Sequence, residues 1–420
     1  MSEKPDRIPV QYPEPIPFFD GVMDPDFESN PTQVYQELAK ISPIVSGRRG
    51  VFHGHRIPNF AALEDENQDL YLTMTYEAWR EVISKNKIFS SERSFKLTEK
   101  SFGQKLLIML DEPEHAQYKK LVLPAFSHRI VTTELTKVTE PIINDLLDGI
   151  AGDGRGELIG QFTAKYPALI ISKIFGVPSE LAETAVELTS AGLSAQAAKD
   201  PALVLARINA FYQAIVDYHR KNPCDDLTST LLATEHDGRL LNDEEVISFM
   251  KVIIGAGLDT TVRQTASLIY LLLENPQQFE DLLAHPELLE SAIWEAARLC
   301  PATSSTPRVA IQDTEVCGVM IPAGSGIYPV IAAANVDPAR WDDPLKFDIR
   351  REKKQIATFG AGVHACLGAN LSLSEMKIAM TGVLNRLKNL RKDPALWPSV
   401  KMRGYKLRAP NILPVLWDAT

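Results

Sequence analysis

A single long helical pattern, which begins near Asn242 and runs to Leu273, constrains the fold of this chain more than any other feature. Asn242 is a residue type that caps helix starts, and the acidic residues that follow it favour the positive end of the helix dipole. Asn275 and Pro276 end the pattern. The expected helix has roughly 30 residues and is about 45 Å long. Most of the remaining chain is also helical by periodicity, with strands mainly after Pro301, so we expect a mainly α fold with a smaller β region.

The middle of this pattern, from Ile254 to Thr261, breaks the rules for a helix interior. It contains glycines, each costing about 1 kcal/mol relative to alanine, β-branched threonines, and Asp259 within an apolar run. Local rules that fail together in one place suggest a functional site. Small residues would let a flat molecule pack against the helix backbone, and a locally widened helix could hold a water molecule. The alternative is a site of close packing between two helices.

A glycine-rich stretch around Cys366, from Thr358 to Ala369, leads into another helical pattern that runs to about Leu387. Glycine lets the backbone approach a bulky group closely, and a cysteine at a helix start has its thiolate favoured by the helix dipole. The stretch could therefore present a thiolate to haem iron. One alternative is a variant dinucleotide-binding fingerprint, which lacks the acidic residue expected about 20 positions later. The other is a plain turn with a buried cysteine, whereas zinc is disfavoured because no second cysteine lies nearby.

Two further pairs of residues are spaced to share a helix face. His115 and Lys119 are four residues apart, and they either hold one anion together or belong to a solvated surface. Glu295 and Arg298 are three residues apart and can form an ion pair, although this spacing alone is common.

Composition narrows the class of protein. The net charge of −10 gives little support to nucleic-acid binding. The four cysteines form no close-spaced pattern, which disfavours a disulfide framework and favours a reducing, cytoplasmic compartment. We find no repeats, flexible linker, signal peptide or membrane anchor, and therefore expect a single domain over residues 1–420, of which residues 1–30 form an extended arm.

Three motifs together make the chain resemble the cytochrome P450 family over nearly its whole length. The stretch from Phe359 to Gly368 resembles the family's cysteine-ligand signature, and Ala256 to Thr261 resembles its oxygen-activating motif on the long helix. Glu295 and Arg298 resemble its structural Glu-x-x-Arg pair, and all three motifs stand in the family's order and spacing. The resemblance implies the cytochrome P450 fold, with haem b lying between the long helix and the cysteine loop with the helix that follows it.

The resemblance also implies roles for individual residues. Cys366 would be the thiolate ligand of the iron, and Asp259 and Thr260 would be the acid–alcohol pair that delivers protons to dioxygen. The haem propionates would take donors from His115, Lys119, Arg308 and His364. Most relatives carry arginine where this chain has Lys119, so a bidentate clamp would become a point charge. Phe359, Gly368 and Ala256 would also contact the haem. The structural triad would join Glu295 and Arg298 to Arg351 or, alternatively, to Arg350.

The activity implied by the resemblance is hydroxylation of a small hydrophobic compound by a haem-thiolate monooxygenase. Residues that would line the substrate pocket are Phe102, Gln104, Val252, Gly255, Ala256, Ser304, Thr306 and Leu407. Several stretches are similar to the camphor monooxygenase group, but Gly103 stands where that group has its ketone-binding tyrosine. We therefore expect a monoterpenoid or similar compound rather than camphor itself.

The redox partners implied by the resemblance are a [2Fe-2S] ferredoxin and its reductase, since this chain has no flavin or iron–sulfur segment. The ferredoxin would dock on the cysteine side of the haem, through the basic residues Lys120, Arg129, Lys353 and Lys354. Two alternative functions remain: a peroxygenase that uses H₂O₂ with the same haem, and a non-catalytic haem-binding or ligand-binding protein.

Overall fold

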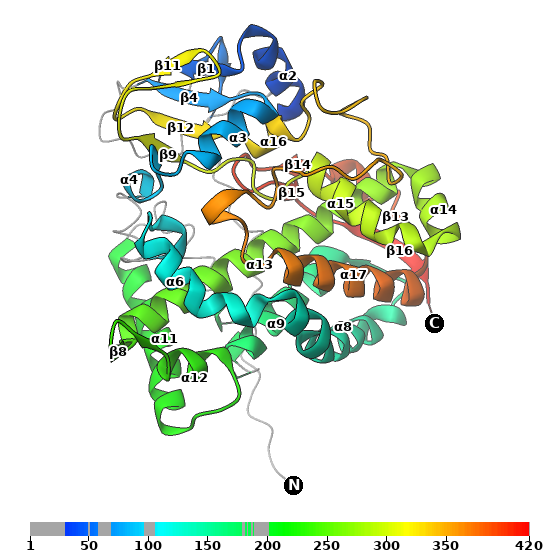
Figure 1. Ribbon diagram of the computed structural model, residues 1–420. Helices are drawn as coiled ribbons and strands as arrows, with labels where there is room; N and C mark the ends of the chain where they lie inside the picture. The colour runs from blue at the N-terminus through cyan, green and yellow to red at the C-terminus, as the bar shows by residue number, and fades with distance from the viewer. Residues whose placement is uncertain are drawn as a thin grey trace.

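The computed structural model describes residues 30–419 except 49–50, 58–68, 96–105, 179–180, 183, 186–187 and 189–200. Residues 1–29 of the expected arm, and the expected pocket residues Phe102 and Gln104, lie outside the described residues. The described chain is mainly helical with a smaller β region, as the sequence predicts (Figure 1). None of the described helices combines the length and the apolar composition that crossing a membrane requires.

The elements have the following bounds. The α-helices are α2 (Pro31–Ile41), α3 (Tyr76–Ser84), α4 (Glu92–Phe95), α6 (Glu114–Val122), α7 (His128–Ile130), α8 (Thr136–Ala151), α9 (Tyr166–Ile174), α11 (Pro201–Lys221), α12 (Leu227–Leu232), α13 (Asp243–Glu274), α14 (Pro276–Ala284), α15 (Leu289–Leu299), α16 (Ile331–Ala334) and α17 (Ala369–Arg386). The strands are β1 (Ile44–Gly47), β2 (Val51–Phe52), β3 (His55–Arg56), β4 (Leu70–Thr73), β5 (Phe89–Ser90), β6 (Arg155–Glu157), β7 (Glu235–His236), β8 (Arg239–Leu240), β9 (Arg308–Ala310), β10 (Thr314–Val316), β11 (Val319–Ile321), β12 (Gly326–Pro329), β13 (Lys388–Lys392), β14 (Met402–Arg403), β15 (Ala409–Pro410) and β16 (Pro414–Asp418). Short 3₁₀ or π turns are η1 (Leu107–Met109), η2 (Leu123–Phe126), η3 (Val131–Leu135), η4 (Ile159–Thr163), η6 (Pro286–Leu288), η7 (Gly362–His364) and η8 (Trp397–Ser399).

The predicted long helix is α13, which spans 32 residues and runs through the middle of the helical part of the molecule (Figure 1). Its start is fixed by a capping box. The Asn242 side chain accepts a hydrogen bond from the backbone N–H of Glu245, and the Glu245 carboxylate accepts one from the backbone N–H of Asn242. At the other end, Pro276 begins α14, so the chain turns away directly after Asn275.

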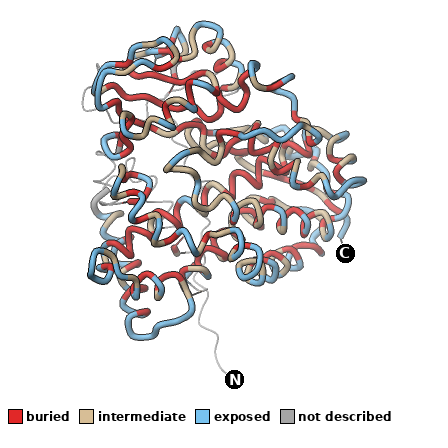
Figure 2. The backbone as a smooth tube through the Cα atoms, viewed as in Figure 1, coloured by how far each residue is buried: buried red, intermediate tan, exposed pale blue. Residues whose placement is uncertain are grey.

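Each half of α13 is buried in a different hydrophobic core. The first half, from Val246 to Ile254, packs with residues of α6, α9, α11 and α12. The second half, from Ala266 to Leu273, packs with residues of α8, α15, α17 and β16. In Figure 2, the residues coloured as buried lie mainly along the segments inside the molecule, and the exposed ones lie at its outer edges. The short segment between the two cores is therefore the part of α13 that remains available to a site.

The larger sheet has the strand order β1-β4-β12-β9-β5, in which β4 and β12 are parallel and the other pairs are antiparallel. Side chains alternate between its faces, as expected for strands. Leu70 and Leu72 pack with α2 on one face, while Tyr71 and Ile327 pack with α3 on the other. This sheet carries Arg308 at the first position of β9, opposite Ile327 of β12.

The Glu-x-x-Arg pair lies on α15 and is fully buried. Arg298 donates two hydrogen bonds to the Glu295 carboxylate, of 2.7 and 2.9 Å. The third member is Arg351, whose Nε donates to Glu295 at 3.0 Å, whereas Arg350 pairs with Asp281 at the surface. Arg351 also donates to backbone carbonyls between Asp342 and Lys346, so the triad fastens an irregular segment to α15.

Gly176 adopts a left-handed backbone conformation with φ of 66°, close to a buried ion pair of 3.0 Å between His219 and Asp226. A β-carbon at Gly176 would collide with the Asp226 carboxylate and lie 2.6 Å from Nε2 of His219. Gly238 also has a positive φ of 75°, but a β-carbon there would meet no atom within 4 Å. We expect Gly238→Ala to lower the free energy of unfolding by about 1–2 kcal/mol. Gly176→Ala should lower it by clearly more, and equal urea-unfolding curves for the two variants would contradict this packing.

A second pair of variants tests the triad. Arg351 is 10% exposed in its side chain and donates to a buried carboxylate, whereas Arg350 is 53% exposed. We expect Arg351→Ala to lower the free energy of unfolding by about 2 kcal/mol or more. Arg350→Ala should change it by less than about 1 kcal/mol, because exposed ion pairs contribute little. Chemical denaturation of both variants measures the difference. A larger loss of stability in Arg350→Ala would show that Arg351 is not the third member of the triad.

Candidate functional site

The cysteine loop is closed by a backbone hydrogen bond of 2.8 Å, which the N–H of Cys366 donates to the carbonyl of Phe359. Gly360 and Gly362 have φ of 68° and 66°, a conformation that disfavours other residues, so the glycines expected from the sequence serve this turn. Cys366 itself comes three residues before the first residue of α17. Its side chain is accessible from an internal cavity. The protein around that cavity still buries the thiol, and this burial raises its pKa.

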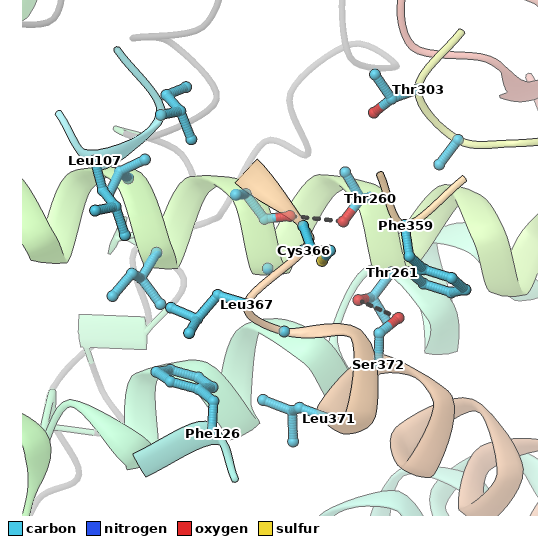
Figure 3. A pocket seen from close by; sticks show the side chains of 18 of the residues that line it. Leu107, Phe126, Thr260, Thr261, Thr303, Phe359, Cys366, Leu367, Leu371 and Ser372 are labelled. Atoms are coloured by element: carbon cyan, nitrogen blue, oxygen red, sulfur yellow. Dashed lines mark hydrogen bonds between the residues drawn. The ribbon is translucent and has the colours of Figure 1, made fainter. Parts of the chain in front are cut away.

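The cavity has a volume of about 260 Å³ and lies between the middle of α13 and the loop that precedes α17. Figure 3 shows Cys366 on that loop, and Thr260 and Thr261 on α13. From the cysteine loop and the start of α17, the wall includes Phe359, His364, Cys366 and Gly368. The two segments that the sequence singles out, far apart in the chain, therefore face one cavity.

The face of α13 that lines the cavity follows from helical spacing. Val252, Ala256 and Thr260 follow one another at intervals of four residues and all belong to the cavity wall. Gly255 and Asp259 form a neighbouring stripe, and neither is part of the described wall. Gly255 therefore lies outside the described cavity wall, and its contact with substrate stays a prediction.

The helix α13 is not locally widened, since it stays α-helical through the segment from Gly255 to Thr261. The Thr260 hydroxyl donates a hydrogen bond of 2.6 Å to the carbonyl of Ala256, one turn earlier (Figure 3). This bond satisfies the hydroxyl without a water molecule inside the helix. Thr260 still lines the cavity, so its oxygen remains accessible from that side.

Asp259 is 4% exposed and forms an ion pair with a residue that the sequence analysis missed. Nε of Arg263, one turn later on α13, donates to Oδ1 of Asp259 at 2.9 Å, and both side chains are buried. Oδ2 of Asp259 is also buried and has no hydrogen-bond partner among the described residues. A buried carboxylate oxygen without a partner needs an explanation, such as a role in catalysis or a bound water. The spacing of four residues would have been a signal for this pair.

The residues expected to bind the haem propionates gather at one edge of the cavity. The rings of His115 and His364 lie 4.1 Å apart between centroids, and both residues line the cavity with Lys119. Lys119 donates hydrogen bonds of 2.6 and 2.9 Å to the carbonyls of Val363 and Ala365 in the cysteine loop. Arg308 is 8% exposed and stands behind this edge rather than in the cavity wall.

The positive charges of this basic edge repel one another. Burial lowers the pKa of His364 to about 3, and the charges of Arg308, His115 and Lys119 add to the effect. Burial also lowers the pKa values of Lys119 and His115 and brings that of Arg308 to about 10. A bound anion would favour the charged forms of all these groups. The edge is thus suited to an anionic ligand.

Two polar features of the site were not predicted from the sequence. Ser91, which follows β5, lies 3.1 Å from Nε2 of His364 through its hydroxyl. At the other end of the cavity, Glu375 of α17 lines the wall beside Ser372, whose hydroxyl accepts a hydrogen bond of 3.2 Å from Thr261. Burial raises the pKa of Glu375 well above its ordinary value, which favours the neutral form of this carboxyl. No sequence motif marks Ser91 or Glu375.

Near residue 304, the described cavity wall contains Ala302 and Thr303 but not Ser304 or Thr306. The expected substrate contacts of Ser304 and Thr306 stay predictions. Leu407 pairs with Thr303 in an isolated bridge but does not line the described cavity. Its role as a substrate contact stays a prediction.

Comparison with known proteins agrees with this site. A family model described as cytochrome P450 matches residues 188–394. The chain is 31% identical to nocardicin C N-oxygenase of Nocardia uniformis, over 83% of this chain and 90% of that protein. It is 30% identical to cytochrome P450 monooxygenase PikC of Streptomyces venezuelae, over 94% of this chain and 93% of that protein. The crystal structure of a myxobacterial cytochrome P450 in complex with myristic acid matches with a TM-score of 0.83 and 27% identity, over 95% of this chain and 99% of the other.

Proposed function

The chain belongs to the cytochrome P450 family, whose members bind haem b through a cysteine thiolate, and from that premise we propose that Cys366 is the iron ligand of a haem-thiolate monooxygenase. One observation carries the proposal. The thiol of Cys366 opens onto the same cavity as the Thr260 hydroxyl, and a basic edge borders that cavity. The described residues thus provide a ligand, a proton-donating group and an anion site around one space.

The donor set fits haem b in two independent respects. A thiolate is one of the axial ligands that proteins offer to haem iron, and nearby backbone N–H groups of Gly368 and Ala369 favour the thiolate form of Cys366. The two propionates of haem b are anions that need donors. His115, Lys119 and His364 would hold them, with the buried charge of Arg308 behind. The lowered pKa values of these bases support an anion as the missing partner.

The chain's own residues would control water and protons in the site. When bound, the haem supplies the activation of dioxygen. Thr260 would donate a proton from its hydroxyl on the cavity wall, after turning from the Ala256 carbonyl. Asp259 would take up a proton from solvent at Oδ2 and pass it to the Thr260 hydroxyl, while Arg263 holds the other carboxylate oxygen. Apolar residues such as Val252 and Ile253 would exclude bulk water.

We propose that the substrate is a small hydrophobic compound, with monoterpenoids as the first class to test. The cavity supports this because Leu107, Val252 and Ile253 present apolar side chains, while Thr303 offers one hydroxyl. A spin-state titration with terpenoids, aromatic compounds and fatty acids would identify the class. Fatty acids belong in the panel because one similar structure contains myristic acid.

We further propose that electrons arrive from a [2Fe-2S] ferredoxin with its reductase, in the cytoplasm. Lys120, Arg129, Lys353 and Lys354 are all exposed, as a docking surface for an acidic partner requires. Lys120 directly follows Lys119 on α6, and Lys353 and Lys354 precede the cysteine loop. The four cysteines are free, in keeping with a reducing compartment.

Replacement of the proposed ligand gives the first test of this function. The reduced carbon monoxide complex of the wild-type protein should absorb at the position specific for thiolate ligation. Cys366→Ala should abolish that band, because no other thiol lines the described cavity wall. Cys224→Ala is the matched control, since Cys224 is exposed and should leave the band unchanged. An imidazole-type spectrum in the wild-type protein would reject haem-thiolate ligation.

Replacement of Thr260 tests proton delivery. Thr260→Ala removes the only atom of this side chain that can donate a proton, so reductant consumption should continue while hydrogen peroxide replaces hydroxylated product. Thr260→Ser keeps a hydroxyl and should retain most of the coupling. The measurement is product and peroxide formed per reductant consumed. Unchanged coupling in Thr260→Ala would contradict the role, and full turnover with peroxide alone but none with dioxygen and reductant would identify a peroxygenase.

A further inference from the structure

Tyr118 stands on the buried face of α6, between the two residues of that helix that border the cavity. Tyr118 and Lys119 follow His115 by three and four residues, so all three lie on one side of the helix. Tyr118 is 4% exposed, and its hydroxyl donates a hydrogen bond of 2.5 Å to Oε1 of Glu245, in the first turn of α13. The residues in contact are 127 positions apart in the sequence.

Glu245 is a strongly held acceptor. Both of its oxygens receive hydrogen bonds from Arg239 of β8, of 2.7 and 2.8 Å, and Oε2 also accepts the backbone N–H of Asn242 at 2.8 Å. The hydrogen bonds from Arg239 are the main reason that the pKa of Glu245 is lowered to about 2. The carboxylate is therefore charged at any pH at which the protein would be assayed. Its side chain is 4% exposed, so it cannot move without breaking several bonds.

The helix α6 is held at three places. At its N-terminal end, the Glu112 carboxylate accepts the backbone N–H of Ala116 at 3.3 Å and lies 3.3 Å from Nδ1 of His115. On one side, Lys119 is tied to the cysteine loop through the carbonyls of Val363 and Ala365. On the other side, Tyr118 is tied to α13 through Glu245. The short helix therefore links α13 to the cysteine loop, which form two walls of the cavity.

We propose that Tyr118 and Glu245 are positioning residues that fix the rotation of α6 and so hold His115 and Lys119 against the haem propionates. This inference rests on the proposed function, but it adds residues that no motif contains. Tyr118 acts on the cofactor through its neighbours on α6. Among its own partners are Glu245 for the hydroxyl and Phe249 and His236 for the ring, with ring centroids 5.9 and 5.0 Å away.

The variant Tyr118→Phe isolates the hydroxyl, because the ring contacts with Phe249 and His236 remain available. We expect haem b to dissociate about tenfold faster from this variant, as the loss of a hydrogen bond to a charged group predicts. The rate is measured by transfer of haem to excess apomyoglobin. The thiolate spectrum of the remaining bound haem should be unchanged, since the backbone hydrogen bond from Cys366 to Phe359 closes the cysteine loop without Tyr118.

Reconstitution with haem dimethyl ester separates positioning from general loosening. This cofactor has no free propionates, so Tyr118→Phe should release it no faster than the wild-type protein does. Tyr166→Phe is the matched control, because the Tyr166 hydroxyl also bonds to α13, at Thr265, but from α9. It should not speed the release of haem b selectively. Glu245→Gln keeps an acceptor for Tyr118 and should give a smaller increase than Tyr118→Phe.

Two outcomes would overturn the inference. One is equally faster loss of haem b and of its dimethyl ester from Tyr118→Phe, which would mean that the hydroxyl only stabilises the fold. The other is no change in the rate for haem b. Failure of the proposed function looks different, since the wild-type protein itself would then lack the thiolate spectrum.

Discussion

The burial of both halves of α13 in separate hydrophobic cores is the constraint on which the rest of the structure depends. Val246 to Ile254 are held by one set of helices and Ala266 to Leu273 by another, so the helix can neither slide nor turn. Its central segment is then free to carry residues that are poor helix formers. Thr260 reaches the cavity from this fixed segment, and Asp259 is held one stripe away by Arg263. Packing at a distance thus sets the geometry of the site.

The ionisable side chains are distributed unevenly around the cavity. One edge carries several bases whose charges disfavour one another, and elsewhere on the wall burial raises the pKa of the Glu375 carboxyl. Lys119 is kept in place by two carbonyls of the loop that also presents Cys366. The anion site and the thiol are therefore parts of one local structure. A ligand with a metal centre and anionic groups at one edge would satisfy both at once.

The features that could be predicted from the sequence are those that depend on the type and spacing of a few neighbouring residues. The cap at Asn242, the stop at Pro276 and the glycines around Cys366 each follow from the conformational needs of a few adjacent residues. The resemblance favoured Arg351 over Arg350 as the third member of the triad, and the structure has Arg351 there, although only the fold determines in which directions adjacent residues of an irregular segment point. Contacts between distant segments, such as Tyr118 with Glu245, leave no pattern in one sequence at all. The expected substrate contacts at Gly255 and Ser304 lie outside the described cavity wall and stay predictions, because a resemblance transfers positions but not the orientation of each side chain.

The carboxylate of Glu245 caps a helix, pairs with an arginine and accepts a hydrogen bond from a tyrosine. A residue with that many simultaneous partners cannot drift alone during evolution. Loss of the acid would leave Arg239 without its counter-charge and the Tyr118 hydroxyl without an acceptor, while a change in either partner would leave the acid in place but weakened. We therefore expect these three positions to vary together among relatives, so that their co-occurrence traces a subgroup that anchors this helix in the same way.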